Sequence, residues 1–429
     1  MNNNFFKNKK PELLAPASGM IELIIAFKYG ADAVYIGGEE FSLRAKATNF
    51  TNEEIIEAIK YSHNINKKIY IAANIFAHNN DIEEAKEYFK FLNEYVPDGV
   101  IISDVGMISI AKEYMPNVPI HISTQANTTN YMTCDFWYHQ GIKRVVAARE
   151  LSLEEISTIK SNLPSDFEIE TFVHGAMCIS YSGRCLLSAF FTHKSANLGS
   201  CTHPCRWKYT LKDRLNNFDL DDSSLVLEES ERPNEYFPVY ENDRGTYIMN
   251  SKDLCMIEHI DDLIKCNIDS LKIEGRMKTP LYVSTIVRVY RKAIDDYILS
   301  PDIYKSNMEF YKSEILKCTY REYTTGFYYN NPDESSQIYS NNTYVIGSTF
   351  YGIVDNIEDD YIVIVQKNKF SINDDIEIMK PNGDNIICKV LEIRDYETNE
   401  AQSSCPHAGQ KLKVKLSLIP EKYDVLRSI

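Results

Sequence analysis

Residues Asn52–Asn74 read NEEIIEAIKYSHNINKKIYIAAN, and this stretch indicates the fold class of the chain. Its first part, Asn52–Ile65, spaces apolar residues as on one face of a helix. Thr51 or Asn52 would serve as its N-cap, and acidic residues follow in the first turn. The last part, Ile69–Asn74, is a short apolar run that ends on a polar residue, which is typical of a buried strand. A helix followed directly by a buried strand is the repeating unit of α/β proteins.

The same alternation extends in both directions through most of the chain before residue 300. Eight runs of the buried-strand type occur: Glu12–Ala15, Ala33–Gly37, Ile69–Asn74, Gly99–Ser103, Ile120–Ser123, Arg144–Arg149, Glu168–Val173 and Ser270–Glu274. Helical patterns include Ile82–Tyr95, Leu153–Leu163 behind the expected N-cap Ser152, and Leu281–Leu299. Eight strands alternating with helices fit either a closed parallel barrel or an open doubly wound sheet.

Polar side chains at the ends of these runs favour the barrel. They follow several different strands: Asn74, Ser123, Gln125, Asn127, Arg149, Glu150, His174, Glu274 and Arg276. Active sites of (β/α)8 barrels are assembled in this way, from the carboxyl ends of several strands around one face. A doubly wound sheet concentrates its ligand at one crevice, and the sequence contains no GxGxxG motif. We therefore expect an α/β protein built on a (β/α)8 TIM-like barrel.

The remaining segments predict an insertion and a second domain. A cysteine-rich interruption of about residues 178–267 separates the last two runs, and a helix is expected to begin near Leu254. From Gly347 onward apolar and polar residues alternate, and Pro381-Asn382-Gly383-Asp384 is a hairpin turn signal. We expect the following organisation: the barrel with its insertion over 1–330, a linker over 331–345 and a small C-terminal β-barrel domain over 346–429.

Composition restricts the possible partners and the compartment. The net charge of −15 over 429 residues argues against non-specific adhesion to nucleic acid or membrane, without excluding RNA binding through a local basic patch. Met1–Lys10 lacks the apolar core of a signal peptide, and no run approaches the ~20 apolar residues that cross a bilayer. We expect a cytoplasmic protein without a membrane partner, in which cysteines are thiols or metal ligands.

Four of the ten cysteines form a cluster with the spacing C-x6-C-x15-C-x3-C: Cys178, Cys185, Cys201 and Cys205. Thiolates bind soft metals, so zinc or an iron–sulfur cluster would suit them. Structural zinc sites usually show two tight pairs, whereas only the second pair is tight here, which favours an iron–sulfur cluster. Ordinary buried thiols are the alternative, because cysteine packs well as a small hydrophobic residue.

Five motifs occur in order along the chain: ELLAPAS (Glu12–Ser18), GADAVYIGG (Gly30–Gly38), GAMCISYSGRCLLSAF (Gly175–Phe190), NSKDLC (Asn250–Cys255) and SLKIEGRMK (Ser270–Lys278). Together they resemble the collagenase-like peptidase family U32. The resemblance runs from about Glu12 to the C-terminus, including the small terminal β-domain, and is greatest to the tRNA-hydroxylating branch of the family.

The resemblance implies a particular chemistry. Some members of the family are described as collagenases without an agreed catalytic residue. Others are oxygen-independent hydroxylases that hold a 4Fe–4S cluster on four cysteines and take the hydroxyl group from prephenate. Carried over to this chain, the cluster ligands are Cys178, Cys185, Cys201 and Cys205. The implied partners are the anticodon region of a tRNA and, as some relatives work in pairs, a paralogous member of the family.

Candidate catalytic residues lie around the seventh and eighth runs: Glu274, His174, Lys252 and Asp253. His174 could transfer protons, or it could be a core histidine whose hydrogen bonds are satisfied. Lys252 and Asp253 could form an acid–base pair. Alternatively, Ser251 or Asp253 could cap the helix expected near Leu254.

Candidate substrate-binding residues are Arg149, Glu150, Arg276, Lys278, Gln125 and Asn74. The arginine fork suits carboxylates or phosphates, which fits the two carboxylates of prephenate. The alternatives are a salt bridge between Arg276 and Glu274, and an ion pair within the barrel for Arg149 and Glu150. Basic residues around Trp207 and Tyr209 suit an unpaired RNA base, or a solvated charged face.

The leading hypothesis from the sequence is a hydroxylase that modifies the wobble uridine of tRNA. The main alternative is a collagenase-like peptidase of unassigned catalytic type, although neither G-x-S-x-G nor HExxH occurs. A third alternative is an iron–sulfur scaffold or partner subunit without an active site of its own.

Overall fold

The computed structural model divides into two compact units, and each is described by itself. The first comprises residues 1–20, 32–277 and 321–344, and the second comprises residues 21–31, 278–320 and 345–429. The structure describes residues 9–42, 49–177, 180–181, 226–228, 236–238, 240–242, 245–247, 251–330, 336, 338 and 345–429. The predicted linker lies largely outside these residues, and the predicted domain limits stay predictions.

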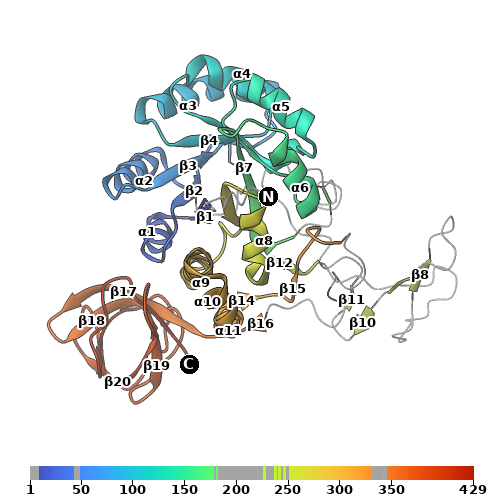
Figure 1. The fold of residues 1–429 in the computed structure, drawn as a ribbon. Helices are drawn as coiled ribbons and strands as arrows, with labels where there is room; N and C mark the ends of the chain where they lie inside the picture. The colour runs from blue at the N-terminus through green and yellow to red at the C-terminus, as the bar shows by residue number, and fades with distance from the viewer. Residues whose placement is uncertain are drawn as a thin grey trace, which may run out of the picture. The chain divides into compact units, whose positions relative to one another are not determined.

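Eight parallel strands form a closed ring in the first unit (Figure 1). They are β1 (Glu12–Pro16), β2 (Ala33–Gly37), β3 (Lys68–Ala72), β4 (Gly99–Ile102), β5 (Ile120–Ile122), β6 (Arg144–Val146), β7 (Glu168–Ala176) and β13 (Ser270–Ile273). Each pairs in parallel with the next, and β13 pairs with both β7 and β1, which closes the ring. This confirms the predicted (β/α)8-type barrel.

Helices lie outside the ring, between successive strands (Figure 1). In the first unit they are α2 (Asn52–Asn64), α3 (Ile82–Tyr95), α4 (Val105–Tyr114), α5 (Tyr131–His139), α6 (Leu153–Ser161) and α8 (Ile260–Lys265), with 3-10 turns at Asn79–Asp81, Thr124–Ala126 and Ile257–His259. Thr51 and Ser152 form complete capping boxes, with Glu54 and Glu155 respectively, which confirms both predicted N-caps. Among the described residues, no helix is both long and apolar enough to span a bilayer.

The prediction of a helix beginning near Leu254 is wrong. Residues Asp253–Cys255 form the strand β12, which pairs antiparallel with the end of β7 and parallel with β15 (Tyr323–Thr324). Helix α8 begins only at Ile260. The predicted helix does not form there because the end of β7 supplies backbone hydrogen bonds to this segment, and the local sequence does not reveal them. Asp253 therefore belongs to a strand and is not a helix cap.

The remaining described segments before β12 are two short antiparallel pairs. Strand β8 (Val226–Glu228) pairs with β9 (Tyr236–Pro238), and β10 (Tyr240–Asn242) pairs with β11 (Gly245–Tyr247).

A buried ionic network occupies the amino-terminal half of the barrel. Arg144 Nη1 lies 2.7 Å from Glu12 Oε1 and 3.0 Å from Glu170 Oε2, and Lys272 Nζ lies 2.7 Å from Glu170 Oε1. Burial by itself would raise the pKa of Glu12, but Arg144, together with Lys68 and the Tyr70 hydroxyl, outweighs burial, and the pKa falls to about 2. The amino-terminal face of such barrels supports stability and the carboxyl face supports catalysis. We therefore assign this network to stability.

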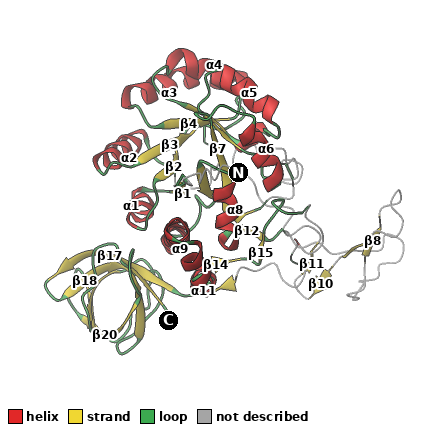
Figure 2. Cartoon of the chain, viewed as in Figure 1, coloured by secondary structure: helices red, strands yellow, loops and turns green. Residues whose placement is uncertain are grey.

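The second unit contains an antiparallel β-barrel and helices (Figure 2). Its strands are β14 (Thr319–Tyr320), β16 (Val345–Ile346), β17 (Phe350–Glu358), β18 (Tyr361–Val365), β19 (Asp375–Met379), β20 (Ile386–Asp395), β21 (Ala401–Gln402), β22 (Lys411–Leu416) and β23 (Val425–Arg427). The order β19-β23-β17-β18-β22-β20 closes through pairing of β19 with β20. That last pair encloses Pro381–Asp384, which confirms the predicted hairpin and β-domain.

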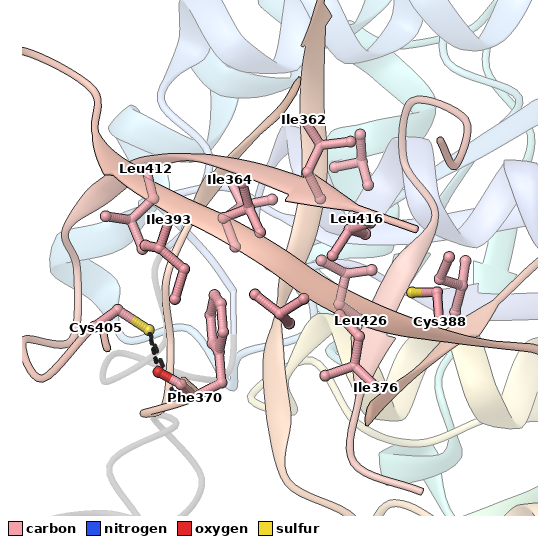
Figure 3. Close-up of a cluster of buried hydrophobic side chains, with 14 residues drawn as sticks. Ile362, Ile364, Phe370, Ile376, Cys388, Ile393, Cys405, Leu412, Leu416 and Leu426 are labelled. Carbon is pink, nitrogen blue, oxygen red and sulfur yellow. Dashed lines mark hydrogen bonds between the residues drawn. The ribbon is translucent and has the colours of Figure 1, made fainter. Parts of the chain in front are cut away.

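Apolar side chains from alternate positions of these strands fill this barrel (Figure 3). Phe370 lies within the cluster, and its carbonyl oxygen accepts a hydrogen bond from Cys405 Sγ at 3.1 Å. Cys388 is also part of this core. Both cysteines are therefore packing residues, as predicted for the dispersed thiols.

The same unit includes four helices, and two of them, α9 and α11, share a buried ionic network with the strands. The helices are α1 (Met20–Lys28), α9 (Pro280–Leu299), α10 (Pro301–Ser306) and α11 (Met308–Ile315). Arg427 of β23 is fully buried and lies 2.8 Å from Glu314 of α11 and 2.6 Å from Glu377 of β19. The network joins helix to barrel, so these helices and the C-terminal strands form one unit.

Candidate active site

The carboxyl end of the barrel holds an ion pair between two predicted site residues. Arg149 follows β6 by three residues and Glu274 directly follows β13. Arg149 Nη2 donates to Glu274 Oε2 across 2.9 Å, and each side chain keeps 14% of its surface exposed. The Arg149 guanidinium also lies 4.1 Å from the centre of the Phe172 ring. The pair is therefore fixed in orientation but reachable from solvent.

A second polar group joins the ends of β3, β4 and β5, and two of its members, Asn74 and Gln125, were predicted. Asn74 Nδ2 donates to Gln125 Oε1 at 2.7 Å, and the hydroxyl of Ser103 donates to the same oxygen at 3.2 Å. Ser103 Oγ also lies 3.1 Å from the carbonyl oxygen of Asn74. The three side chains hold one another in place. An ordered amide pair of this kind can present donors and acceptors to a polar ligand.

Arg276 is held close to the end of β2. Its Nη1 donates to Ser42 Oγ at 2.7 Å, and only 6% of the residue is exposed. A Cβ atom placed on Gly37 would lie 1.8 Å from the same nitrogen. Glycine at position 37 therefore makes room for the guanidinium, a role that the sequence alone did not reveal.

Two predicted catalytic residues lie where β7 meets β12. His174 is 1% exposed, and its ring centre lies 5.3 Å from that of Tyr323. In the strand register Asp253 pairs with Ala176, and Cys255 pairs with His174. Asp253 is 3% exposed, and its Oδ1 has no hydrogen-bond partner within the described part of the chain. This carboxylate therefore merits attention as a candidate acid or base.

Other predicted residues are not brought into these groups. The Lys252 ammonium forms an ion pair with Glu322 at 3.0 Å. The ion-pair partner of Lys252 is thus Glu322 and not the expected Asp253. Lys278 belongs to the second unit, where its ammonium lies 5.1 Å from the centre of the Tyr282 ring. Glu150 is half-buried in the turn after β6.

The four predicted cluster ligands, Cys178, Cys185, Cys201 and Cys205, lie outside the described residues, as does the basic segment around Trp207. Met177, the residue before Cys178, directly follows the end of β7. The first cysteine thus follows the carboxyl end of a barrel strand. Among the described residues, no three His, Cys, Asp or Glu side chains gather in a way that would hold a metal ion.

A small pocket beside Arg149 was not predicted from the sequence. Its walls include Arg149, Thr171, Phe172, Met177, Leu254 and Tyr328. Burial raises the pKa of Tyr328 to about 12, and its hydroxyl donates to the carbonyl oxygen of Phe172 at 2.5 Å. The position of Arg149 at a strand end was the only sequence signal for this pocket. Tyr328 comes from a segment more than 150 residues away, which no local pattern could place there.

The fold and this group of side chains define a (β/α)8-type barrel with a polar, arginine-containing site at the carboxyl face of its strands. Matches to models of protein families identify the family to which the chain belongs. Residues 18–338 match Peptidase family U32, and residues 347–427 match the Peptidase family U32 C-terminal domain. The chain belongs to peptidase family U32.

Three relatives illustrate what the chain is similar to. "tRNA hydroxylation protein P1" of Bacillus subtilis (strain 168) is 39% identical, over 95% of this chain and 92% of the relative. "tRNA hydroxylation protein P" of Escherichia coli (strain K12) is 38% identical, over 93% of this chain and 92% of the relative. "Uncharacterized protease MJ0090" of Methanocaldococcus jannaschii is 41% identical, over 75% of this chain and 73% of the relative. Two of these matches thus span nearly the whole length of both chains.

Proposed function

We propose that the chain is an RNA-modifying enzyme of the cytoplasm that hydroxylates the wobble uridine of tRNA to 5-hydroxyuridine, independently of oxygen. The observation that carries this proposal is the match, over more than nine-tenths of both chains, to two relatives named as tRNA hydroxylation proteins. The ordered polar groups at the carboxyl face of the barrel support it. They form the kind of surface on which barrel enzymes bind substrate.

The proposal includes a 4Fe–4S cluster on Cys178, Cys185, Cys201 and Cys205. The donor set fits such a cluster, because four thiolates are its usual ligands. The first of these cysteines follows β7 by two residues, so its sequence position is next to the pocket wall at Met177. The cluster would supply electron-transfer chemistry, which protein side chains cannot provide.

The chain's own residues would bind and orient the two substrates. Prephenate, the proposed hydroxyl source, carries two carboxylates, and the Arg149 guanidinium is suited to one of them. Glu274 fixes the orientation of that guanidinium through the 2.9 Å hydrogen bond. The amide pair of Asn74 and Gln125 offers hydrogen-bonding groups suited to the edge of an unpaired uracil.

The experiment is an anaerobic reaction with purified full-length protein, prephenate and tRNA from an Escherichia coli strain that lacks its tRNA hydroxylation protein P. Mass spectrometry of the digested tRNA should show 5-hydroxyuridine that depends on both protein and prephenate. Product that forms without prephenate would remove the co-substrate from the proposal. Unchanged tRNA, with iron-loaded protein, would remove the function.

The cluster is tested separately by iron and sulfide analysis. We expect about four iron atoms per chain in the wild type and a large loss in each of Cys178→Ser, Cys185→Ser, Cys201→Ser and Cys205→Ser. Cys134→Ser is the matched control, because Cys134 is a buried thiol of α5. Iron loss in the control alone, or equal iron in all variants, would contradict the ligand assignment.

The peptidase alternative has its own decisive outcome. Gelatin cleavage that persists in Cys178→Ala and Cys201→Ala, without any tRNA product, would favour the peptidase.

A paralogous partner is also proposed from the family resemblance. Co-purification of a second family member, together with inactivity of the isolated chain, would support it.

A further inference from the structure

We propose that one outer face of the C-terminal β-barrel, formed by β22 and the strands beside it, binds the phosphate backbone of RNA. We call it the basic face, and its cations are Lys411, Lys413 and Lys415 of β22 and Arg394 of β20. All four belong to the second unit. The inference rests on the proposed function for the choice of tRNA as the RNA.

The first argument is the alternation of side chains along β22, Lys411–Leu416, which reads KLKVKL. Leu412, Val414 and Leu416 belong to the hydrophobic core of the barrel. The three lysines therefore point outward in a row, because successive side chains of a strand alternate between its two faces. Neighbouring lysines in the row lie roughly 7 Å apart along the strand, a spacing comparable to that of successive phosphates in an RNA strand.

The second argument is a like charge on the neighbouring strand. Arg394 lies directly opposite Lys413 in the strand register. Like charges in this position destabilise a sheet, and a polyanion that contacts both would remove the repulsion. The side chains of Lys413, Lys415 and Arg394 keep between 27% and 37% of their surface exposed, and Lys411 is an exposed residue. A ligand in solvent can therefore reach all four cations.

The third argument is that a ring and a carboxylate hold two of the lysines in place. The ammonium groups of Lys411 and Lys413 lie 4.0 Å and 5.3 Å from the centre of the Tyr396 ring. Glu358 accepts a hydrogen bond from the Tyr396 hydroxyl at 3.1 Å and pairs with Lys413 at 2.8 Å. Within the described part of the chain, Lys411 has no carboxylate partner. Its ammonium thus has N–H donors to offer a phosphate.

The other two cations of the basic face are held in a similar way. Glu392 accepts a hydrogen bond from the Tyr361 hydroxyl at 2.6 Å and pairs with Arg394 at 2.5 Å. Asp360 pairs with Lys415 at 3.1 Å. Each paired cation keeps further donors, because an ammonium has three N–H groups and a guanidinium has five. Solvent-exposed ion pairs contribute little to stability, so a phosphate can compete with these carboxylates at small cost.

RNA is the occupant that these features favour. The chain carries a net charge of −15, so a polyanion is repelled by the protein as a whole and needs a local group of cations. The rings of Tyr361 and Tyr396 are partly exposed among the cations. Cations interleaved with aromatic rings are the combination on which single-stranded nucleic acid binds. An acidic protein segment would match the cations but would bring no bases to the rings.

Binding is measured by fluorescence anisotropy of end-labelled Escherichia coli tRNA with the full-length protein over a series of salt concentrations. We expect Lys411→Gln/Lys413→Gln to weaken binding roughly thirtyfold in about 0.1 M salt. The slope of log affinity against log salt should become less steep by about 1.4–1.8, because each phosphate contact contributes about 0.7–0.9. Lys411→Arg/Lys413→Arg keeps both charges and should bind as the wild type does.

Lys305→Gln/Lys380→Gln is the matched control. It also removes two lysines from the second unit, but Lys305 belongs to α10 and Lys380 directly follows β19, so neither lies on the basic face. The control should keep the wild-type affinity and salt slope. The thermal midpoint of Lys411→Gln/Lys413→Gln should be unchanged, because both side chains lie outside the core.

The possible failures are distinguishable. Wild-type affinity and salt slope in Lys411→Gln/Lys413→Gln would overturn the basic face, as would an equal loss in the matched control. Poly-L-glutamate that displaces the labelled tRNA as well as unlabelled tRNA does, at equal charge, would overturn the choice of RNA and favour an acidic protein segment.

The hydroxylation assay separates this inference from the proposed function. In Lys411→Gln/Lys413→Gln the KM for tRNA should rise while kcat stays constant. A wild-type KM in this variant would overturn the basic face and leave the function standing. Binding of tRNA that depends on the two lysines, without any hydroxylated product from iron-loaded protein, would overturn the function and leave the basic face standing.

Discussion

Arg149 and Glu274 lie 125 residues apart in the sequence, yet the arginine Nη2 and the glutamate Oε2 are 2.9 Å apart at the carboxyl face of the barrel. The pairing follows from closure of the ring, in which β6, β7 and β13 are successive neighbours. Phe172 of β7, the strand between them, supports the guanidinium from one side. Arg149, predicted to bind substrate, and Glu274, predicted to be catalytic, thus form one ion pair.

Glu274→Gln should reduce tRNA hydroxylation at least tenfold with little loss of stability. The amide keeps the shape of the side chain but removes the charge that orients Arg149, and misplacement of a binding group reduces turnover strongly. Initial rates and thermal midpoints provide the measurement. Glu83→Gln is the control, since Glu83 forms an exposed pair with Lys86 and its loss should leave the rate unchanged. Full activity of Glu274→Gln would show that the pair is only structural.

Gly37→Ala should destabilise the chain by about 1–3 kcal/mol, because the new Cβ would overlap the guanidinium of Arg276 and the hydroxyl of Ser42. Urea unfolding measures the change. The double variant Gly37→Ala/Arg276→Ala removes the main overlap, so the two effects should be clearly less than additive. Strict additivity would contradict the proposed contact. Gly141→Ala is not a suitable control, because its positive φ introduces backbone strain.

Stability should fall on acidification, in part through Glu12. The pKa of Glu12 lies at about 2 in the folded chain and at 4.5 when unperturbed. A lowered pKa contributes stability that is fully present above pH 4.5 and is lost as the pH falls toward 2. The contribution is roughly 3 kcal/mol. Unfolding free energies measured between pH 7 and pH 3 should therefore decline less steeply in Glu12→Gln than in the wild type.

Two checks accompany the Glu12 experiment. Glu12→Gln should already be less stable than the wild type at pH 7, because Arg144 loses a buried partner. Glu83→Gln is the matched control, since the exposed pair of Glu83 and Lys86 should contribute little at any pH. Parallel pH profiles for wild type and Glu12→Gln would refute the role assigned to this carboxylate.

Arg427→Met should destabilise the second unit by about 3–5 kcal/mol. The substitution leaves Glu314 and Glu377 buried with fewer cationic partners, and an uncompensated buried charge is costly. Urea denaturation followed by circular dichroism measures the loss. Arg394→Met removes an arginine from a half-exposed pair on the same barrel and should change stability little. Equal effects of the two substitutions would contradict the argument.

Features that depend on near neighbours in the chain were predictable. Both capping boxes join residues three apart, and the apolar runs that became β1 and β2 start at the predicted residues. The hairpin at Pro381–Asp384 joins adjacent strands. Local hydrogen bonds and hydrophobic periodicity fix these features, so short segments carry the information.

Contacts between distant segments were decided by the tertiary structure alone. The sequence placed Arg149 and Glu274 at strand ends but could not pair them, since the pairing depends on strand order and register around a closed ring. The same holds for the Glu12–Arg144 pair inside runs that look apolar, and for β12 where a helix was expected. Burial and charge pairing act in three dimensions, so the sequence determined the strands and helices, and only their closure into a barrel determined which polar groups meet.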